Sequence, residues 1–182
     1  FSIAFSEHMC YYINTYYVRP AHAQAALLPR IPYIAFAFYQ GETQMGKITA
    51  IVCVDDGMGL MFNKRRQSKD SELRKWILTF LDGKKLFMDS YTHGQFSDEP
   101  QDHLVVSDSY ISEMSDGDIC FTEKNADALP AGCDYIVCRW NRRYPSDVKL
   151  TADPAAYSIE LLAEIPGSSH EKMTIEHWRR KE

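Results

Sequence analysis

Apolar residues recur along the chain in short runs of strand length, separated by Gly, Pro, Asp and Asn. Runs of this kind that are rich in Val, Ile, Tyr and Phe predict β-strands. The aromatic content of 13% favours sheet for the same reason. The predicted strands cover residues 1–5, 11–18, 33–39, 47–54, 59–62, 86–90, 119–122, 135–140, 147–150 and 157–164, and residues 91–116 are expected to be polar and irregular.

Two segments have the features of helices. Residues 68–81 carry one apolar stripe, with Ser68 as a candidate N-cap and Gly83 as the stop. Residues 169–180 follow an S-x-x-E capping box made by Ser168 and Glu171. We therefore expect one α+β domain over residues 1–182, with a largely antiparallel sheet or partial barrel and two main helices, at about 68–81 and 169–180.

Composition narrows the class of protein. The net charge of −5 argues against wholesale wrapping of nucleic acid but allows a local basic site. No apolar run reaches the roughly 20 residues that a membrane-spanning helix needs, and the start of the chain lacks the pattern of a signal peptide. The five Cys show no C-x-x-C pairing, which favours buried thiols in a reducing cytoplasm. We expect a cytoplasmic protein with no cofactor, no metal and no membrane contact.

Two loops resemble ligand sites. Gly41–Lys47 has the G-x4-G-K spacing of a phosphate-binding loop, but Ile48 replaces the magnesium-binding hydroxyl. The residues that follow are β-branched and predict a strand where such a loop must open a helix, so a hairpin is the better interpretation. Asp55-Asp56-Gly57 is interpreted as a tight turn, and an acid pair for a cation is the alternative.

Charge is unevenly distributed along the chain. Residues 64–85 hold eight basic and three acidic side chains, whereas residues 89–123 hold nine acidic ones and no Lys or Arg. The basic cluster is suited to phosphate, and the acidic stretch to a basic protein partner. Two solvated faces, complementary across a homodimer, are the alternative.

Residues 139–145 (RWNRRYP) end a predicted strand with three arginines among aromatic residues. Arginine forks onto phosphate, and aromatic rings stack on bases, so Arg139, Trp140 and Arg142 are the candidate phosphate- or ligand-binding residues. The alternative is that Trp140 belongs to the core and the arginines mark a hairpin.

Three side chains are candidates for acid–base chemistry. His93 lies in a predicted loop beside Gly94, and His170 with Lys172 lies at the expected start of the last helix. A histidine titrates near neutral pH, and a lysine stabilises developing negative charge. His170 and His177 lie two helical turns apart in this interpretation, too far to share a metal ion.

Residues 28–36 (LPRIPYIAF), 139–145 (RWNRRYP) and 167–172 (GSSHEK) resemble a group of short bacterial proteins commonly labelled ribonuclease Z. True ribonuclease Z is a zinc enzyme of the metallo-β-lactamase fold and needs an H-x-H-x-D-H cluster. The six His of this chain are scattered and form no such cluster, so the resemblance carries no zinc site to this chain.

Two functions follow as hypotheses. The first is contact with RNA or another phosphate-bearing ligand, extended to metal-independent ribonuclease activity by His93, His170 and Lys172. The second is a non-enzymatic, immunity-type protein that meets a basic partner through residues 89–123.

Overall fold

A computed structural model describes residues 47–182, and the structural statements below concern that part of the chain. The strands expected before residue 47, the Gly41–Gly46 loop and the stretch 28–36 lie outside it. The single domain over residues 1–182 therefore stays a prediction.

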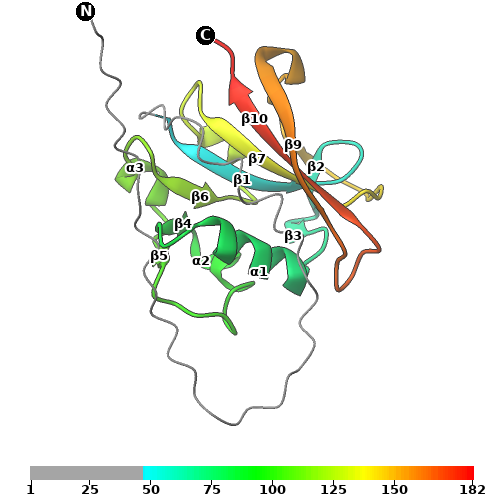
Figure 1. Cartoon of the computed structure of the whole chain (residues 1–182), viewed down its shortest axis with the longest axis horizontal. Coiled ribbons are helices and arrows are strands. Elements are labelled where there is room, and N and C mark those ends of the chain that lie inside the picture. The colour runs from blue at the N-terminus through cyan, green and yellow to red at the C-terminus, as the bar shows by residue number, and fades with distance from the viewer. Residues whose placement is uncertain (1–46) are drawn as a thin grey trace, which may run out of the picture. The chain divides into compact units, whose positions relative to one another are not determined.

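The main sheet has seven strands in the order β5-β4-β6-β1-β7-β10-β9 (Figure 1). The first five are parallel to one another, and β10 and β9 complete the sheet as an antiparallel pair. The strands are β1 (Thr49–Val54), β4 (Leu86–Met88), β5 (Leu104–Val106), β6 (Ile119–Phe121), β7 (Asp134–Arg139), β9 (Tyr157–Ile165) and β10 (Met173–Arg180).

The α+β class is confirmed, but the expected largely antiparallel sheet or partial barrel is wrong. The main sheet is mixed, and no barrel closes among residues 47–182. Strands β1 and β7 are apolar on both faces, which is typical of parallel strands covered on both sides.

Helix α1 (Ser71–Phe80) covers one face of the sheet, where its Leu73 and Ile77 pack with Ile51 of β1. The other face packs with Tyr110 of α3 (Tyr110–Glu113) and includes Val52, the next residue of the same strand. Alternation along β1 therefore supplies two apolar cores, one on each side.

Smaller elements fill the connections. Strands β2 (Gly59–Phe62), β3 (Arg65–Arg66) and β8 (Val148–Lys149) form a second, antiparallel sheet. The remaining elements are α2 (Ser90–His93) and the single 3₁₀ turns η1 (Ala126–Ala128) and η2 (Pro154–Ala156). The expectation that residues 91–116 are irregular is wrong in part, because β5 and α3 lie there; each is too short to give a periodic pattern.

The first predicted helix is confirmed as α1, with Asp70 rather than Ser68 as its N-cap. The second, over residues 169–180, is wrong, because residues 173–180 form β10 between β7 and β9. Ser168 does act as a cap, but for another element: its hydroxyl accepts a hydrogen bond from the amide of Ser71 at the start of α1 (2.9 Å).

The order of the strands points to the edge of the main sheet at which a ligand is expected to bind. The chain leaves β1 toward β4 on one side, whereas it leaves β6 toward β7 on the other. In open sheets with parallel strands, ligands bind beyond the carboxyl ends of the strands where the connections diverge in this way. Asp55 and Trp140 directly follow β1 and β7 at this edge, and Glu123 lies two residues after the end of β6.

Within residues 47–182, none of the helices combines the length and the apolar composition that crossing a membrane requires.

Candidate functional site

Asp55 anchors the segment that follows β7 to the end of β1. Its Oδ1 accepts hydrogen bonds from the amides of Gly57 (2.8 Å) and Gly59 (2.6 Å), and its Oδ2 accepts one from the amide of Tyr144 (2.9 Å). The predicted turn is confirmed, although the positive φ falls at Met58 (61°) rather than at Gly57. This buried carboxylate therefore fixes residues 141–145 in position.

Asn141 turns the chain out of β7. Its φ of 51° is one that Asn tolerates better than most residues, and its side-chain amide donates to the Lys172 carbonyl (3.1 Å) and to Thr174 Oγ1 (2.9 Å). The backbone carbonyl of the next residue, Arg142, accepts a hydrogen bond from the amide of Asp56 (3.1 Å). The backbone that carries Arg142 is thus held from both sides.

Asp70 joins the tight turn between β9 and β10 to the start of α1. Its Oδ1 accepts the amides of Glu72 (2.9 Å) and Leu73 (3.3 Å), as an N-cap does. Its Oδ2 accepts the amide (2.7 Å) and the hydroxyl (2.9 Å) of Ser169. A side chain at Gly167 would put its Cβ 2.6 Å from this oxygen, so the turn needs glycine to approach so closely.

The same donors set the charge of Asp70. Burial raises the pKa of this carboxyl, but the hydrogen bonds from the backbone of Ser169 and Ser168 and from the Ser169 hydroxyl outweigh burial and hold the pKa well below its usual range. Asp70 is therefore a fixed negative charge at neutral pH.

His170 is held on every side. Its ring stacks on Trp140, with centroids 4.6 Å apart, while Nε2 lies 3.0 Å from the Tyr144 hydroxyl and Nδ1 lies 3.0 Å from Ser169 Oγ. The Ser169 hydroxyl donates to Asp70, so it accepts from Nδ1–H, and Nε2 is then the acceptor for the Tyr144 hydroxyl. Both ring nitrogens are engaged, and only 3% of the side chain is exposed.

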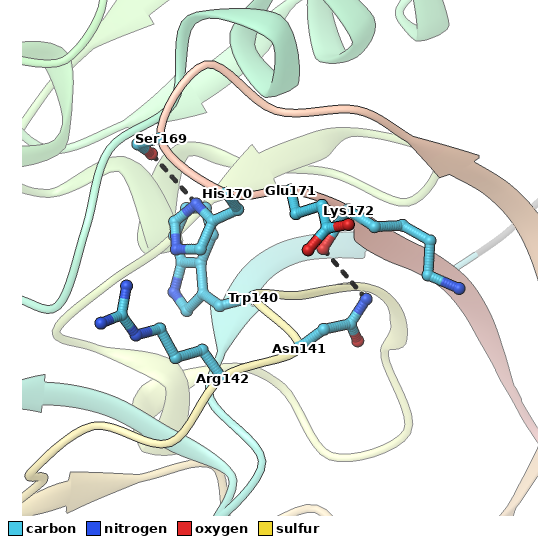
Figure 2. Close-up of a pocket in the computed structure, with 7 residues that line it drawn as sticks. All are labelled: Trp140, Asn141, Arg142, Ser169, His170, Glu171 and Lys172. Carbon is cyan, nitrogen blue, oxygen red and sulfur yellow. Dashed lines mark hydrogen bonds between the residues drawn. The ribbon is translucent and has the colours of Figure 1, made fainter.

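Next to this stack lies a hollow of about 500 Å³, lined by residues 140–142 and 169–172 (Figure 2). The exposed guanidinium of Arg142 has no carboxylate partner within residues 47–182 and lies 5.5 Å from the ring centroid of Tyr144. Lys172 points away from Arg142 in Figure 2, and its ammonium pairs with Glu164 (2.6 Å). Arg142 is therefore the available cation of the hollow.

The structure brings together four of the six residues that the sequence singles out: Trp140, Arg142, His170 and Lys172. Arg139 points to the other face of β7, because successive side chains of a strand alternate, and it pairs with Glu176 (3.0 Å). His93 ends α2, which follows β4; β4 lies three strands from β7, about 14 Å across the sheet. Its Nε2 bonds with Gln101 (2.7 Å).

The acidic stretch 89–123 does not present all its charges to solvent. Asp89 and Glu123 are buried, and Glu99 pairs with Arg74 (3.2 Å). A basic partner would meet only the remaining acids, and that partner stays a prediction.

Glu123 belongs to a second polar cluster at the same edge of the sheet. Its Oε2 lies 3.3 Å from Nη2 of Arg66, and its side chain is 7% exposed. Burial raises the pKa of Glu123 to about 7, although the nearby Arg66 lowers it. An acid buried at a strand end with such a pKa is typical of a functional position.

Sequence reasoning misses Asp55 and Asp70 as anchors of the site. Asp55 is interpreted only as part of a turn, and its bond to Tyr144 spans 89 positions of the chain. Asp70 directly precedes the apolar stripe of α1, which is the signal of an N-cap, but its bond to Ser169 spans 99 positions. Contacts at such separations leave no mark in a local pattern.

No protein-family model matches the chain, and no curated protein is significantly similar to it. The resemblance stated above stays a prediction, and its two described stretches, 139–145 and 167–172, meet at the hollow. Among residues 47–182, no group of three or more His, Cys, Asp or Glu side chains is placed to hold a metal ion.

The hydrogen bonds of Asp70 predict that removal of its carboxylate lowers the stability of the protein strongly. We expect Asp70→Ala to lower the free energy of unfolding by about 2–4 kcal/mol, because it removes both a helix cap and the anchor of the turn. Asp153→Ala is the matched control, since Asp153 caps only η2 at an exposed position. Denaturant unfolding measures both variants, and equal losses would contradict the account.

The raised pKa of Glu123 predicts that the free energy of unfolding depends on pH. Because its pKa in the folded chain is raised to about 7, the folded state binds more protons than the unfolded state between the ordinary pKa of Glu and pH 7. Its contribution to stability is therefore greatest at acidic pH and falls as the pH rises through 7. Relative to Glu123→Gln, the wild-type chain should lose up to about 3 kcal/mol between pH 5 and pH 8. A constant difference between the two proteins would refute this.

Proposed function

We propose that the protein binds RNA through its phosphate groups at the hollow beside Trp140 and His170, with Arg142 as the principal contact. The observation that carries the proposal is the guanidinium of Arg142, which has no ion-pair partner among residues 47–182 and stands on a backbone fixed by Asp55, Asp56 and Asn141. Arginine is suited to phosphate because its planar fork can donate two parallel hydrogen bonds. A fixed backbone lowers the entropy lost on binding.

Further cations surround this hollow. Arg65 lines a neighbouring hollow together with Tyr144, whose hydroxyl bonds His170 in the first. The carbonyl oxygen of Lys69 lies 3.0 Å from Ser169 Oγ, so Lys69 flanks the turn. Neither Arg65 nor Lys69 has an ion-pair partner in the described part of the chain. These cations lie near the carboxylates of Asp70 and Glu171, so the edge carries charges of both signs, and the proposal rests on Arg142 rather than on a net positive field.

Two features favour RNA over a small phosphate compound. Arg142 and Arg65 lie in two hollows, and Tyr144, which lines the second, contacts Arg142 and His170 of the first, so a strand that binds both hollows would pass over Tyr144. Phe62, which is 49% exposed, lies in the hollow of Arg65 and offers a face on which an unpaired base can stack.

The proposal covers binding and does not extend to RNA cleavage. A general base must reach the substrate hydroxyl, whereas the ring nitrogens of His170 face Ser169 and Tyr144 and only 3% of its side chain is exposed. His93 lies three strands away, and the ammonium of Lys172 is paired with Glu164.

Substitution of Arg142 tests the proposal. We expect Arg142→Ala to weaken binding of a single-stranded oligoribonucleotide about tenfold or more, since a hydrogen bond to a charged group contributes roughly 1.5–3 kcal/mol. The slope of log affinity against log salt should fall in magnitude by about 0.7, the value for one phosphate contact on a single strand. Fluorescence anisotropy at several salt concentrations measures both quantities.

Arg179→Ala is the matched control, because it removes the same charge from an exposed arginine of β10 that pairs with Glu160. Equal effects of the two substitutions, or no binding by the wild-type chain, would overturn the proposal. Arg142 is exposed, so its variant should unfold at the same temperature as the wild type.

A further inference from the structure

The hollow that contains Arg65 is built by a rigid hairpin. Asn63 and Lys64 have φ values of 49° and 60°, as the two-residue turn between β2 and β3 requires. The amide of Asn63 also donates to Asp147 (2.9 Å). This turn sets Phe62, Arg65 and Arg66 around a hollow of about 320 Å³.

Some N–H groups of the Arg66 guanidinium contact acceptors in the described part of the chain, and others do not. Its Nη2 donates to the Tyr91 carbonyl (2.6 Å) and lies 3.3 Å from Glu123, and its guanidinium stacks on the Tyr91 ring, 4.4 Å from the centroid. Guanidinium has five N–H donors, and within residues 47–182 no acceptor bonds to Nε or Nη1 of Arg66. These donors remain for an anion in the hollow that Arg66 lines.

The protonation state of Glu123 sets the net charge of its pair with Arg66. When the carboxyl is ionised, the pair is neutral; when it is protonated, the charge of Arg66 is uncompensated. The groups that face Glu123 are Arg66 of β3, Thr92 of α2 and Gln95 after it, Asp89 before α2 and Cys53 of β1. Lys124 follows it in the chain and lies over Tyr91 (3.9 Å).

The protonation of Glu123 changes within an accessible range. Its pKa is raised to about 7 by burial, with Arg66 acting in the opposite direction, and Asp89 adds to the rise. An anion that binds Arg66 would repel the ionised carboxylate and so favour its protonated form.

A purely structural ion pair would explain the burial of Glu123, but it would not explain the rest of the hollow. The hollow that Arg66 lines also holds the exposed ring of Phe62 and the guanidinium of Arg65, which has no ion-pair partner in the described part of the chain, and the pair needs neither of them. An aromatic face next to cations is the combination that single-stranded nucleic acid binds.

We propose that this hollow is a second anion subsite, in which Arg65 and Arg66 bind a phosphodiester while Phe62 stacks on the adjoining base, and that Glu123 competes with the anion for Arg66. The identity of the ligand as RNA rests on the proposed function. The competition between Glu123 and an anion does not.

Two probes of constant charge test the subsite on the full chain: sulfate, and an oligouridylate without terminal phosphates. If only the form with protonated Glu123 binds, wild-type affinity should rise about tenfold from pH 8 to pH 6, in proportion to the protonated fraction. Glu123→Gln should bind equally at both pH values, with about the wild-type affinity at pH 6. Arginine Nε–H resonances report sulfate, and anisotropy reports the oligouridylate.

Glu99→Gln is the matched control, because Glu99 pairs with Arg74 and lines neither hollow. It should keep the wild-type dependence on pH. If Glu123→Gln keeps that dependence as well, the subsite is refuted. If sulfate follows the pattern but the oligouridylate binds at neither pH, the subsite stands and the proposed function fails.

A measurement without substitution covers the case in which Glu123→Gln does not fold. Linkage is reciprocal, so sulfate should raise the pH midpoint of the Glu123 carboxyl carbon in the wild-type chain. An unchanged midpoint at a sulfate concentration that shifts the Arg66 resonance would refute the competition.

Discussion

The carboxylate of Asp70 is the interaction on which the site depends. One oxygen caps α1, and the other holds the turn between β9 and β10 through Ser169. That turn presents His170 to Trp140 and Tyr144, so a single buried charge connects α1, the last hairpin and the segment after β7. Asp55 repeats the arrangement at the end of β1, where it binds the amide of Tyr144. Asp55 and Asp70 thus hold the two segments that line the hollow in which we propose that Arg142 binds phosphate.

The histidine at the centre is held in place by the same carboxylate. The acceptor carboxylate of Asp70 orients the Ser169 hydroxyl, which orients the His170 ring, which receives the Tyr144 hydroxyl. Such a chain of hydrogen bonds strengthens each member and leaves none of them free. The proposed functional groups therefore lie outside this network: Arg142 lines the first hollow, Arg65 and Arg66 line the second, and Glu123 pairs with Arg66.

Local patterns predict the elements better than their arrangement. The stripe of α1 and the apolar strands β1, β2 and β7 are readable because each is long or strongly patterned. The final strand is misread because Ser168 and Glu171 match a capping box, while pairing with β7 and β9 decides its structure. The parallel order and the meeting of 139–145 with 167–172 depend on contacts across most of the chain. For the site, the sequence identifies Trp140, Arg142, His170 and Lys172, but not the aspartates that assemble them.

We propose that residues 140–145 and 167–172, which Asp55 and Asp70 hold in position, form a surface that binds the phosphate groups of RNA. Titration of the isotope-labelled full chain with an oligouridylate, followed by amide and arginine side-chain resonances, tests it most directly. We expect the largest shifts in these two segments and at Arg142 Nε–H, followed by those of Arg65 and Arg66. Shifts confined to the acidic stretch 89–123, or none at concentrations that saturate ordinary RNA-binding domains, would contradict it.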